Sequence, residues 1–449
     1  MSKQRIQLSD HFTYFRLLRF VLPCIGTTLF TSIYGIVDGL CVSNFVGKTA
    51  FAAVNLIMPL PMLLGTIGFM LGTGGSAIVG ITLGEGDQKK ADRYFTLFLL
   101  AALVSVSVLA VLGIVFLRPI AILLGAKGEL LDYAVRYGRI LMVSLPTFAL
   151  QNMFQSFFVT AEKPHLGFWF TVGAGCTNMV LDVLMVGIWG WGVEGAAIAT
   201  FISQLVGGVL PVFYFIDRSN SSRLHLCKTS FYSKVLRDAC INGSSELMTN
   251  LSMSLVNILY NYQLLRLAGE NGVAAYGVIM YAAFLFVAVF VGYAVGSAPI
   301  VSFHYGARNH AEVHNLYRKS LRLIAVVAVT LTLASMFIIP CVARIFVGYD
   351  AELLALTSRA FRLYALSFLI MGFNVYASSF FTALGDGVTS ALISFLRTLV
   401  FQVIAILLLP LLLGIDGIWL AVTAAELAAL AVSAAMLLTK DKVFHYRKA

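Results

Sequence analysis

The chain has 449 residues, of which 59% are hydrophobic and only 12% are charged, whereas roughly a quarter of the residues of a soluble domain are charged. This composition excludes an ordinary soluble protein and is typical of a polytopic membrane protein. The formal net charge of +10 is explained by basic residues that flank membrane spans. Because so few charges leave no basic helix face for phosphate contacts, we expect membrane lipids but no nucleic acid as partners.

Twelve apolar segments follow one another along the chain, each long enough for the roughly 20 residues that cross a bilayer. In the first half they cover residues 17–42, 51–83, 92–118, 134–161, 165–188 and 193–216. In the second half they cover residues 237–265, 273–304, 317–345, 357–383, 389–412 and 416–439. We therefore predict an all-α membrane protein with twelve transmembrane helices.

The basic residues predict the orientation, because Lys and Arg near the ends of spans stay in the cytoplasm. With both termini inside, 21 of the 31 Lys and Arg residues lie on the inner side and 9 on the outer side, and the remaining one, Arg397, falls within a span. The N-terminal stretch is polar for too long to be a cleaved signal peptide. We predict a multi-pass protein of the inner (cytoplasmic) membrane with both termini in the cytoplasm.

The sequence repeats itself. "VGKTAFAAVNLIM" at residues 46–58 matches "AGENGVAAYGVIM" at 268–280, "QSFFVTA" at 155–161 matches "SSFFTAL" at 378–384, and "GVEGAAIA" at 192–199 matches "GIDGIWLA" at 414–421. The offset is 222 or 223 residues each time. We predict two pseudo-symmetric six-helix bundles in parallel orientation, with an N-terminal lobe at 1–216, a cytoplasmic linker at 217–234 and a C-terminal lobe at 235–449.

The first predicted span contains an aspartate, Asp38, too deep for its short side chain to reach the interface. Thr27, Thr31 and Tyr34 precede it at helical spacing, so these residues share one face. A carboxylate inside a membrane costs several kcal/mol unless it is paired or hydrated. The stripe therefore indicates a helix that faces a water-filled cavity.

The fifth and sixth spans carry a second polar stripe, with Thr171, Asn178 and Asp182 on one face of the fifth and with Thr200 and Gln204 one turn apart on the sixth. Two carboxylates, an amide and a hydroxyl form a set of hard oxygen ligands suited to a proton or Na⁺. The alternative is a hydrogen-bonded polar cluster that holds the bundle together.

The seventh span opens the second half with a polar stripe that includes Glu246, Asn250 and Asn257. Glu246 lies only nine residues after Arg237, so it is either an acid near the interface or a cavity residue. Arg397 and Glu426 are the other buried charges, and we favour a structural ion pair over substrate contact for them.

The sequence does not predict metal binding, ATP hydrolysis or catalysis. The spacing of His310 and His314 could chelate zinc, but the corresponding loop "LGEGDQKKADR" has no histidine, so we expect no metal site and no cofactor. The sequence has no Walker motif and no paired nucleophile and base, so we expect no catalytic residues and no enzyme activity. Energy would come from an ion gradient or from the substrate gradient.

At these residues the sequence resembles the MATE (multidrug and toxin extrusion) family of antiporters. The resemblance covers essentially the whole chain, including "SIYGIVDGLCVSNFVG" followed by "AAVNLIMP". Similarity to the prokaryotic branch with a cation site in the N-terminal lobe implies that Asp38, Asn178, Asp182 and Thr200 bind the coupling ion, H⁺ or Na⁺. Ion binding there would bend or shift the first helix and expel the drug. The chain departs from the family at Glu162, where glycine is usual.

The resemblance implies export of amphipathic organic cations from a cavity that holds acids beside rings and thioethers. Candidate cavity residues are Tyr34, Gln204, Glu246, Asn250, Asn257, Met58, Met62, Phe69, Met142, Phe148, Phe154, Tyr276, Met280 and Tyr281. A flippase or exporter of lipid-linked or other lipid-like substrates is the alternative, disfavoured because the buried charges are mainly acidic. We expect a monomer.

Overall fold

The computed structural model describes residues 6–46, 48–348 and 350–447; within these ranges, the side chains of residues 36, 38–44, 48, 51 and 345 are not described. The first half contains α1 (Tyr14–Phe45), α2 (Lys48–Ile57), α3 (Pro59–Gly84), α4 (Gln88–Leu123), α5 (Glu129–Thr160), α6 (Pro164–Asp182), the π-helix η1 (Val183–Ile188), α7 (Gly192–Gly208) and α8 (Leu210–Ile216). The second half contains α9 (Ser233–Asn242), α10 (Ser244–Gly306), α11 (His310–Val347), α12 (Ala351–Ala365), α13 (Phe368–Ala383), α14 (Gly387–Phe395), the π-helix η2 (Leu396–Val400), α15 (Phe401–Leu413), α16 (Ile415–Thr439) and α17 (Asp441–Phe444).

Apolar length supports the predicted number of spans. In the described chain, nine helices are long and apolar enough to cross a membrane, and the bent pair α12 and α13 adds a tenth. The long α10 passes through Gly269, whose φ of 60° and ψ of −149° interrupt the helix and divide it into two spans. With α5, which has the length of a span, the all-helical fold has twelve crossings.

Several predicted spans are broken rather than continuous. The segment predicted at 51–83 consists of α2 and α3, which meet at Met58, and Pro59 opens α3. Proline is tolerated in the first turn because its missing N–H would have no helical partner there. The fifth and eleventh spans each contain a π-helical stretch, directly after Asp182 and around Arg397. Such stretches occur frequently at functional sites.

The repeat is visible in the backbone. Left-handed residues occur in pairs separated by 222 or 223 positions: Gly86 and Arg308, Glu162 and Gly385, and Gly192 and Gly414. Asp87 and Asn309 also share this offset, and each caps the next helix by accepting a backbone N–H bond with its side chain. Both halves therefore turn in the same way at equivalent loops. The residue boundaries of lobes and linker remain a prediction.

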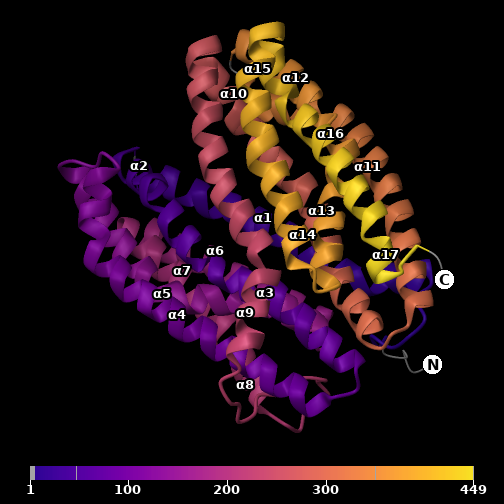
Figure 1. Cartoon of the computed structure of the whole chain (residues 1–449). Coiled ribbons are helices and arrows are strands. Elements are labelled where there is room, and N and C mark those ends of the chain that lie inside the picture. The colour runs from indigo at the N-terminus through magenta and orange to yellow at the C-terminus, as the bar shows by residue number, and fades with distance from the viewer. Residues whose placement is uncertain (1–5, 47, 349, 448–449) are drawn as a thin grey trace.

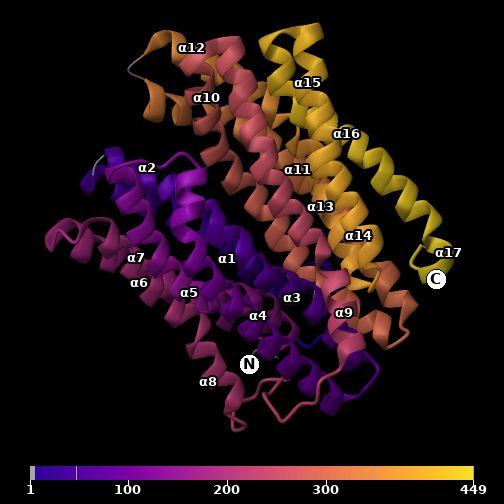
Figure 2. The same cartoon turned by 60° about the vertical axis from the view of Figure 1, so that its left-hand side comes forward.

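The two bundles, called here the N-lobe and the C-lobe, converge toward the end that carries both chain termini and diverge toward the end that carries α2 and α15 (Figures 1 and 2). We call the converging end the terminus side. Glycines permit backbone contact there: a Cβ on Gly84 of α3 would lie 2.0 Å from the carbonyl oxygen of Phe303 of α10, and one on Gly306 would lie 2.1 Å from that of Ile81. Helices in membranes approach this closely only at small residues.

The N-terminal segment bridges the lobes on the terminus side. The backbone N–H of Leu8 donates to Glu162 of the N-lobe (2.9 Å), and that of Phe12 donates to Glu312 of α11 (2.9 Å). Glu162 also pairs with Arg223 of the linker at 2.6 Å. The glutamate that replaces the expected glycine thus adopts a φ of 61° and anchors two segments.

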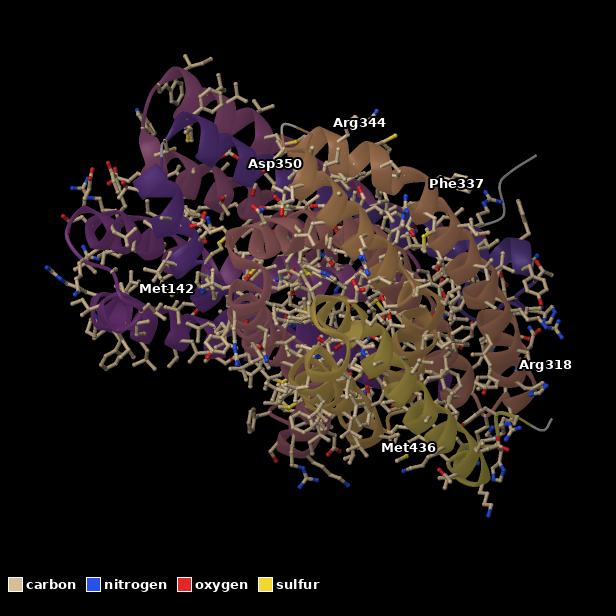
Figure 3. All side chains as sticks on the ribbon, turned by 90° about the horizontal axis from the view of Figure 1, so that it is seen from above. Met142, Arg318, Phe337, Arg344, Asp350 and Met436 are labelled. Carbon is tan, nitrogen blue, oxygen red and sulfur yellow. The ribbon has the colours of Figure 1, made fainter. Side chains whose placement is uncertain are left out.

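Large apolar side chains cover the outside of the bundles. Phe337 of α11 is 81% exposed and Leu123 at the end of α4 is 86% exposed, and Figure 3 shows Phe337 pointing away from the helices. Soluble monomers rarely expose such contiguous apolar surface. This surface is suited to lipid, as expected for a multi-pass membrane protein.

Candidate functional site

A cavity of about 660 Å³ lies mainly in the C-lobe, with α3 and α5 of the N-lobe contributing to its wall. This volume is in the range of pockets for drug-sized ligands. Its wall combines charges, amides, phenol rings and thioethers, including Glu246, Arg397, Glu426, Asn250, Asn257, Gln402, Tyr260, Tyr276, Tyr364, Met62, Met253, Met280 and Met371. The cavity lies between the glycine contacts of the terminus side and the diverging ends of the lobes.

Six predicted cavity residues line this wall: Met62 of α3, then Glu246, Asn250 and Asn257 from the first part of α10, and Tyr276 and Met280 from the second. Glu246 is therefore a cavity residue and not only an acid near the interface. The rings of Tyr260 and Tyr276 stack at a centroid distance of 4.9 Å. They give the cavity a flat aromatic surface beside its acid, which suits a planar cation.

The other eight predicted cavity residues do not line this cavity: Tyr34, Met58, Phe69, Met142, Phe148, Phe154, Gln204 and Tyr281. Phe154 is 1% exposed and packs against Phe158 and Phe215 in the hydrophobic core. Met58 lies at the joint of α2 and α3, where the hydroxyl of Tyr137 is 3.9 Å from its sulfur. Tyr34 packs beside Phe30 of α1, and Gln204 is buried on α7. Helical spacing placed these residues on helices but did not determine which neighbour each side chain meets.

The polar stripe of the fifth span is buried inside the N-lobe. Thr171, Asn178 and Asp182 of α6 are 4%, 1% and 0% exposed. At Gly175, on the same face, a Cβ would lie 2.5 Å from the ring of Phe30 and 3.2 Å from that of Tyr34. The stripe occupies one face of the helix, as its spacing predicts, and this face lies against α1. This structure buries it in helix contacts rather than beside the large cavity.

The amide of Asn178 has no hydrogen-bond partner for either its oxygen or its nitrogen among the described residues, and within the same part of the chain the side-chain oxygen of Gln204 also lacks one. Buried polar groups are nearly always satisfied by protein, water or an ion. These oxygens, together with the Asp182 carboxylate, are donors of the kind that H⁺ and Na⁺ use. The arrangement fits a small cation better than an organic one.

The remaining members of the predicted coupling set are Thr200 and Asp38. The hydroxyl of Thr200 on α7 donates to the carbonyl of Ala196 at 3.0 Å. Its oxygen keeps lone pairs for a further partner. The backbone of residue 38 belongs to α1, but the side chain of Asp38 lies outside the described residues.

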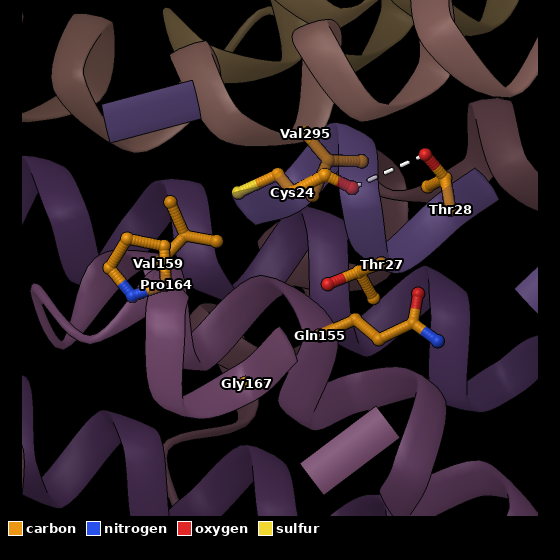
Figure 4. Close-up of a pocket in the computed structure, with 8 residues that line it drawn as sticks. All are labelled: Cys24, Thr27, Thr28, Gln155, Val159, Pro164, Gly167 and Val295. Carbon is orange, nitrogen blue, oxygen red and sulfur yellow. Dashed lines mark hydrogen bonds between the residues drawn. The ribbon is translucent and has the colours of Figure 1, made fainter. Parts of the chain in front are cut away.

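A second pocket of about 10 Å³ lies where α1, α5, α6 and α10 meet, and Figure 4 shows Thr27 and Gln155 lining it. It has room for about one water molecule. Beside it, the hydroxyl of Thr28 lies 3.2 Å from the carbonyl of Cys24 and 2.7 Å from that of Ala288 on α10. This pocket is too small for a drug, so the larger cavity is the candidate substrate site.

The predicted ion pair between Arg397 and Glu426 is present, with 3.6 Å between Nη1 and Oε1. Asn374 of α13 completes the group, because its amide donates to Glu426 Oε2 at 2.7 Å while its oxygen accepts from Ser433 at 2.9 Å. Asn374 is not among the residues expected from the sequence, although an amide within an apolar span is the same kind of signal that identified Asn178.

A sequence model described as MatE matches residues 23–184 and, separately, residues 247–408. The chain belongs to the MatE family. The double match to this MatE chain agrees with the repeat found in its sequence. Over 433 residues the chain is 21% identical to the multidrug export protein MepA of Staphylococcus saprophyticus, covering 95% of this chain and 94% of that protein.

Two solved structures are similar to this MatE chain over 100% of both chains, each with a TM-score of 0.92 and 22% identity. One is described as MATE in complex with MaL6. The other is described as the outward-facing conformation of a multidrug resistance MATE family transporter of the MOP superfamily. This likeness confirms the predicted fold of two six-helix bundles.

Proposed function

We propose that the chain is an ion-coupled antiporter that exports amphipathic organic cations by alternating access. The observation that carries the proposal is the cavity lined mainly by the C-lobe, in which Glu246 lies among tyrosines and methionines. Family membership and full-length similarity to a multidrug export protein support it. The charge distribution makes the terminus side cytoplasmic in this proposal. We further propose that the chain is a monomer in the cell membrane.

The chemistry of the cavity suits the cargo. A carboxylate in a membrane attracts a cation because both lose water there and regain a partner. Stacked Tyr260 and Tyr276 offer ring faces to a planar cation. Unbranched thioethers such as Met280 adapt to ligands of different shape. Such a wall favours many flat cations over one specific ligand.

The ion site of the proposal is the N-lobe set of Asp182, Asn178 and Thr200, with Asp38 added from the sequence. Asp182 is completely buried, and acids inside a membrane typically mark the pathways of ions and protons. Arrival of H⁺ or Na⁺ changes the charge at this carboxylate and favours a different packing of α1 against α6. The ion gradient would act on cargo through this packing, because α1 also contacts α10 through Thr28 and Gly292.

Alternating access follows from the way the lobes meet. Glycine contacts close the terminus side, and the cavity lies beyond them. Two rigid bundles joined by a linker can rock about such a contact, so that it opens while the opposite ends approach. The described conformation is the one closed on the cytoplasmic side in the predicted orientation.

Reconstituted vesicles loaded with ethidium test the proposal. A pH gradient and a Na⁺ gradient are imposed separately on wild type, Asp182→Asn, Asp38→Asn and Glu246→Gln, with the exposed acid Asp132 changed to Asn as the control. We expect wild type and Asp132→Asn to follow one gradient. The two N-lobe variants lose gradient-driven efflux yet bind ethidium within about twofold of wild type, whereas Glu246→Gln weakens binding roughly tenfold.

The outcomes separate the parts of the proposal. If wild type moves ethidium under neither gradient, the export of organic cations is refuted. If Asp182→Asn keeps its coupling, the ion site lies elsewhere. The gradient that wild type follows identifies the coupling ion.

A further inference from the structure

A buried guanidinium in the wall of the large cavity is unexpected for a site that takes cations. Arg397 lies on η2, and its side chain is 13% exposed. An arginine in the middle of a span is costly, and such residues usually face a cavity or pathway and serve a function there. Its positive charge acts on two acids of the same wall, Glu246 and Glu426.

The ion pair with Glu426 does not use the guanidinium fully. The Nη1–Oε1 distance is 3.6 Å, while charge-assisted hydrogen bonds of this type measure about 2.7–2.9 Å. The Nε of Arg397 is buried and finds no hydrogen-bond partner in the described part of the chain. A guanidinium has five N–H donors, so most of the binding capacity of Arg397 is uncommitted.

Glu426 depends less on Arg397 than the ion pair suggests. Its Oε2 accepts the amide of Asn374 at 2.7 Å, and Ser433 fixes that amide from behind. Glu426 therefore has a second hydrogen-bond partner besides Arg397, whereas Arg397 has N–H groups left to bind a ligand. This asymmetry favours an arginine that contacts a ligand over one that serves only as a structural partner.

We propose that Arg397 is the anion-binding group of the cargo cavity, so that the cavity accepts amphipathic compounds that carry a carboxylate beside their cationic ring system. The inference rests on the proposed function of the cavity. Glu246 contacts the cationic part, and the planar guanidinium of Arg397 receives the carboxylate, a match of shape and charge that lysine does not provide. Arg397 is thus a specificity-determining residue.

Rhodamine 110 and rhodamine 123 are a suitable pair of probes, because they share one cationic ring system and differ only in a free carboxylate against its methyl ester. Binding of each dye to purified protein is measured by fluorescence anisotropy for wild type, Arg397→Gln, Arg397→Lys and the double variant Arg397→Gln/Glu426→Gln. Arg362→Gln, at an exposed position of α12, is the matched control. Vesicle efflux of both dyes is measured in parallel.

The ratio of the two dissociation constants is the readout. We expect Arg397→Gln to weaken the binding of rhodamine 110 relative to that of rhodamine 123 by roughly tenfold or more. Arg362→Gln should leave the ratio unchanged. Arg397→Gln alone leaves Glu426 buried without its charged partner, which could prevent folding. The double variant also removes the charge of Glu426, so binding can still be measured if the single variant does not fold. The same change of ratio in the double variant supports a direct contact between Arg397 and the carboxylate of the dye. An intermediate change in Arg397→Lys supports recognition of that carboxylate by the planar guanidinium and not by charge alone.

Two results would overturn the inference: an unchanged ratio in Arg397→Gln, or a wild-type ratio restored in the double variant, which would make Arg397 a structural partner alone. Binding with the expected ratios but no efflux of either dye would refute the proposed function and leave the assignment of Arg397 in place.

Discussion

Replacing Gly84 by alanine tests how the lobes close on the terminus side. A Cβ at this position would lie 2.0 Å from the carbonyl oxygen of Phe303 and 2.7 Å from the backbone nitrogen of Ala307. Ordinary contacts of a Cβ begin at 3.4 Å, so the two helices must separate by about 1.4 Å. Both obstacles are backbone atoms, and no rotamer change can relieve them.

The size of the effect follows from the cost of overpacking, roughly 1–3 kcal/mol. Because 1.36 kcal/mol corresponds to a factor of ten, the population of the closed arrangement falls by roughly fivefold to more than a hundredfold relative to an arrangement in which α3 and α10 are apart. Gly277 provides the control. It lies on α10 with nothing within 4 Å of its added Cβ, so Gly277→Ala leaves the equilibrium unchanged.

Spin labels at Lys89 and Ala311, exposed positions on the helices that follow α3 and α10, report the separation by pulsed electron paramagnetic resonance. Native cysteines are replaced beforehand. We expect a longer distance to gain population in Gly84→Ala and not in Gly277→Ala. Identical distance distributions in wild type and Gly84→Ala would refute the idea that glycine contact holds this side closed.

Two further predictions concern the terminus side. Glu312→Ala removes the buried acceptor of the Phe12 N–H, and the loss of about 1–3 kcal/mol accelerates amide exchange at Phe12 by roughly fivefold or more; an unchanged rate by mass spectrometry would contradict the anchoring role. Partial burial alone would raise the pKa of Asp386, but hydrogen bonds from Lys440 and Thr389 prevail and lower this pKa below its usual 3.8. Because the folded carboxyl has the lower pKa, its stabilisation is complete above pH 3.8 and is lost as pH falls through the folded value. Thermal unfolding should therefore show a constant difference between wild type and Asp386→Asn above pH 3.8 that shrinks below it, and a difference that grows there would contradict this sign.

Local features of the sequence predicted much of the fold. The length of the apolar segments predicted the crossings, and the repeat predicted paired loops such as those of Gly192 and Gly414, whose φ values are 59° and 58°. Helical spacing also predicted that Thr171, Asn178 and Asp182 share a face, and all three are buried. These properties depend on residues a few positions apart, where helix geometry alone decides the arrangement.

Only the tertiary structure decided which side chains meet. Met280 and Phe154 are both apolar residues of membrane spans, yet one lines the cavity and the other lies in the core. Glu246 and Arg397 come together in one wall from helices about 150 residues apart. The rotation of each helix about its axis and the neighbours it packs against depend on the whole bundle, because apolar side chains cover most of each span and do not specify a preferred partner.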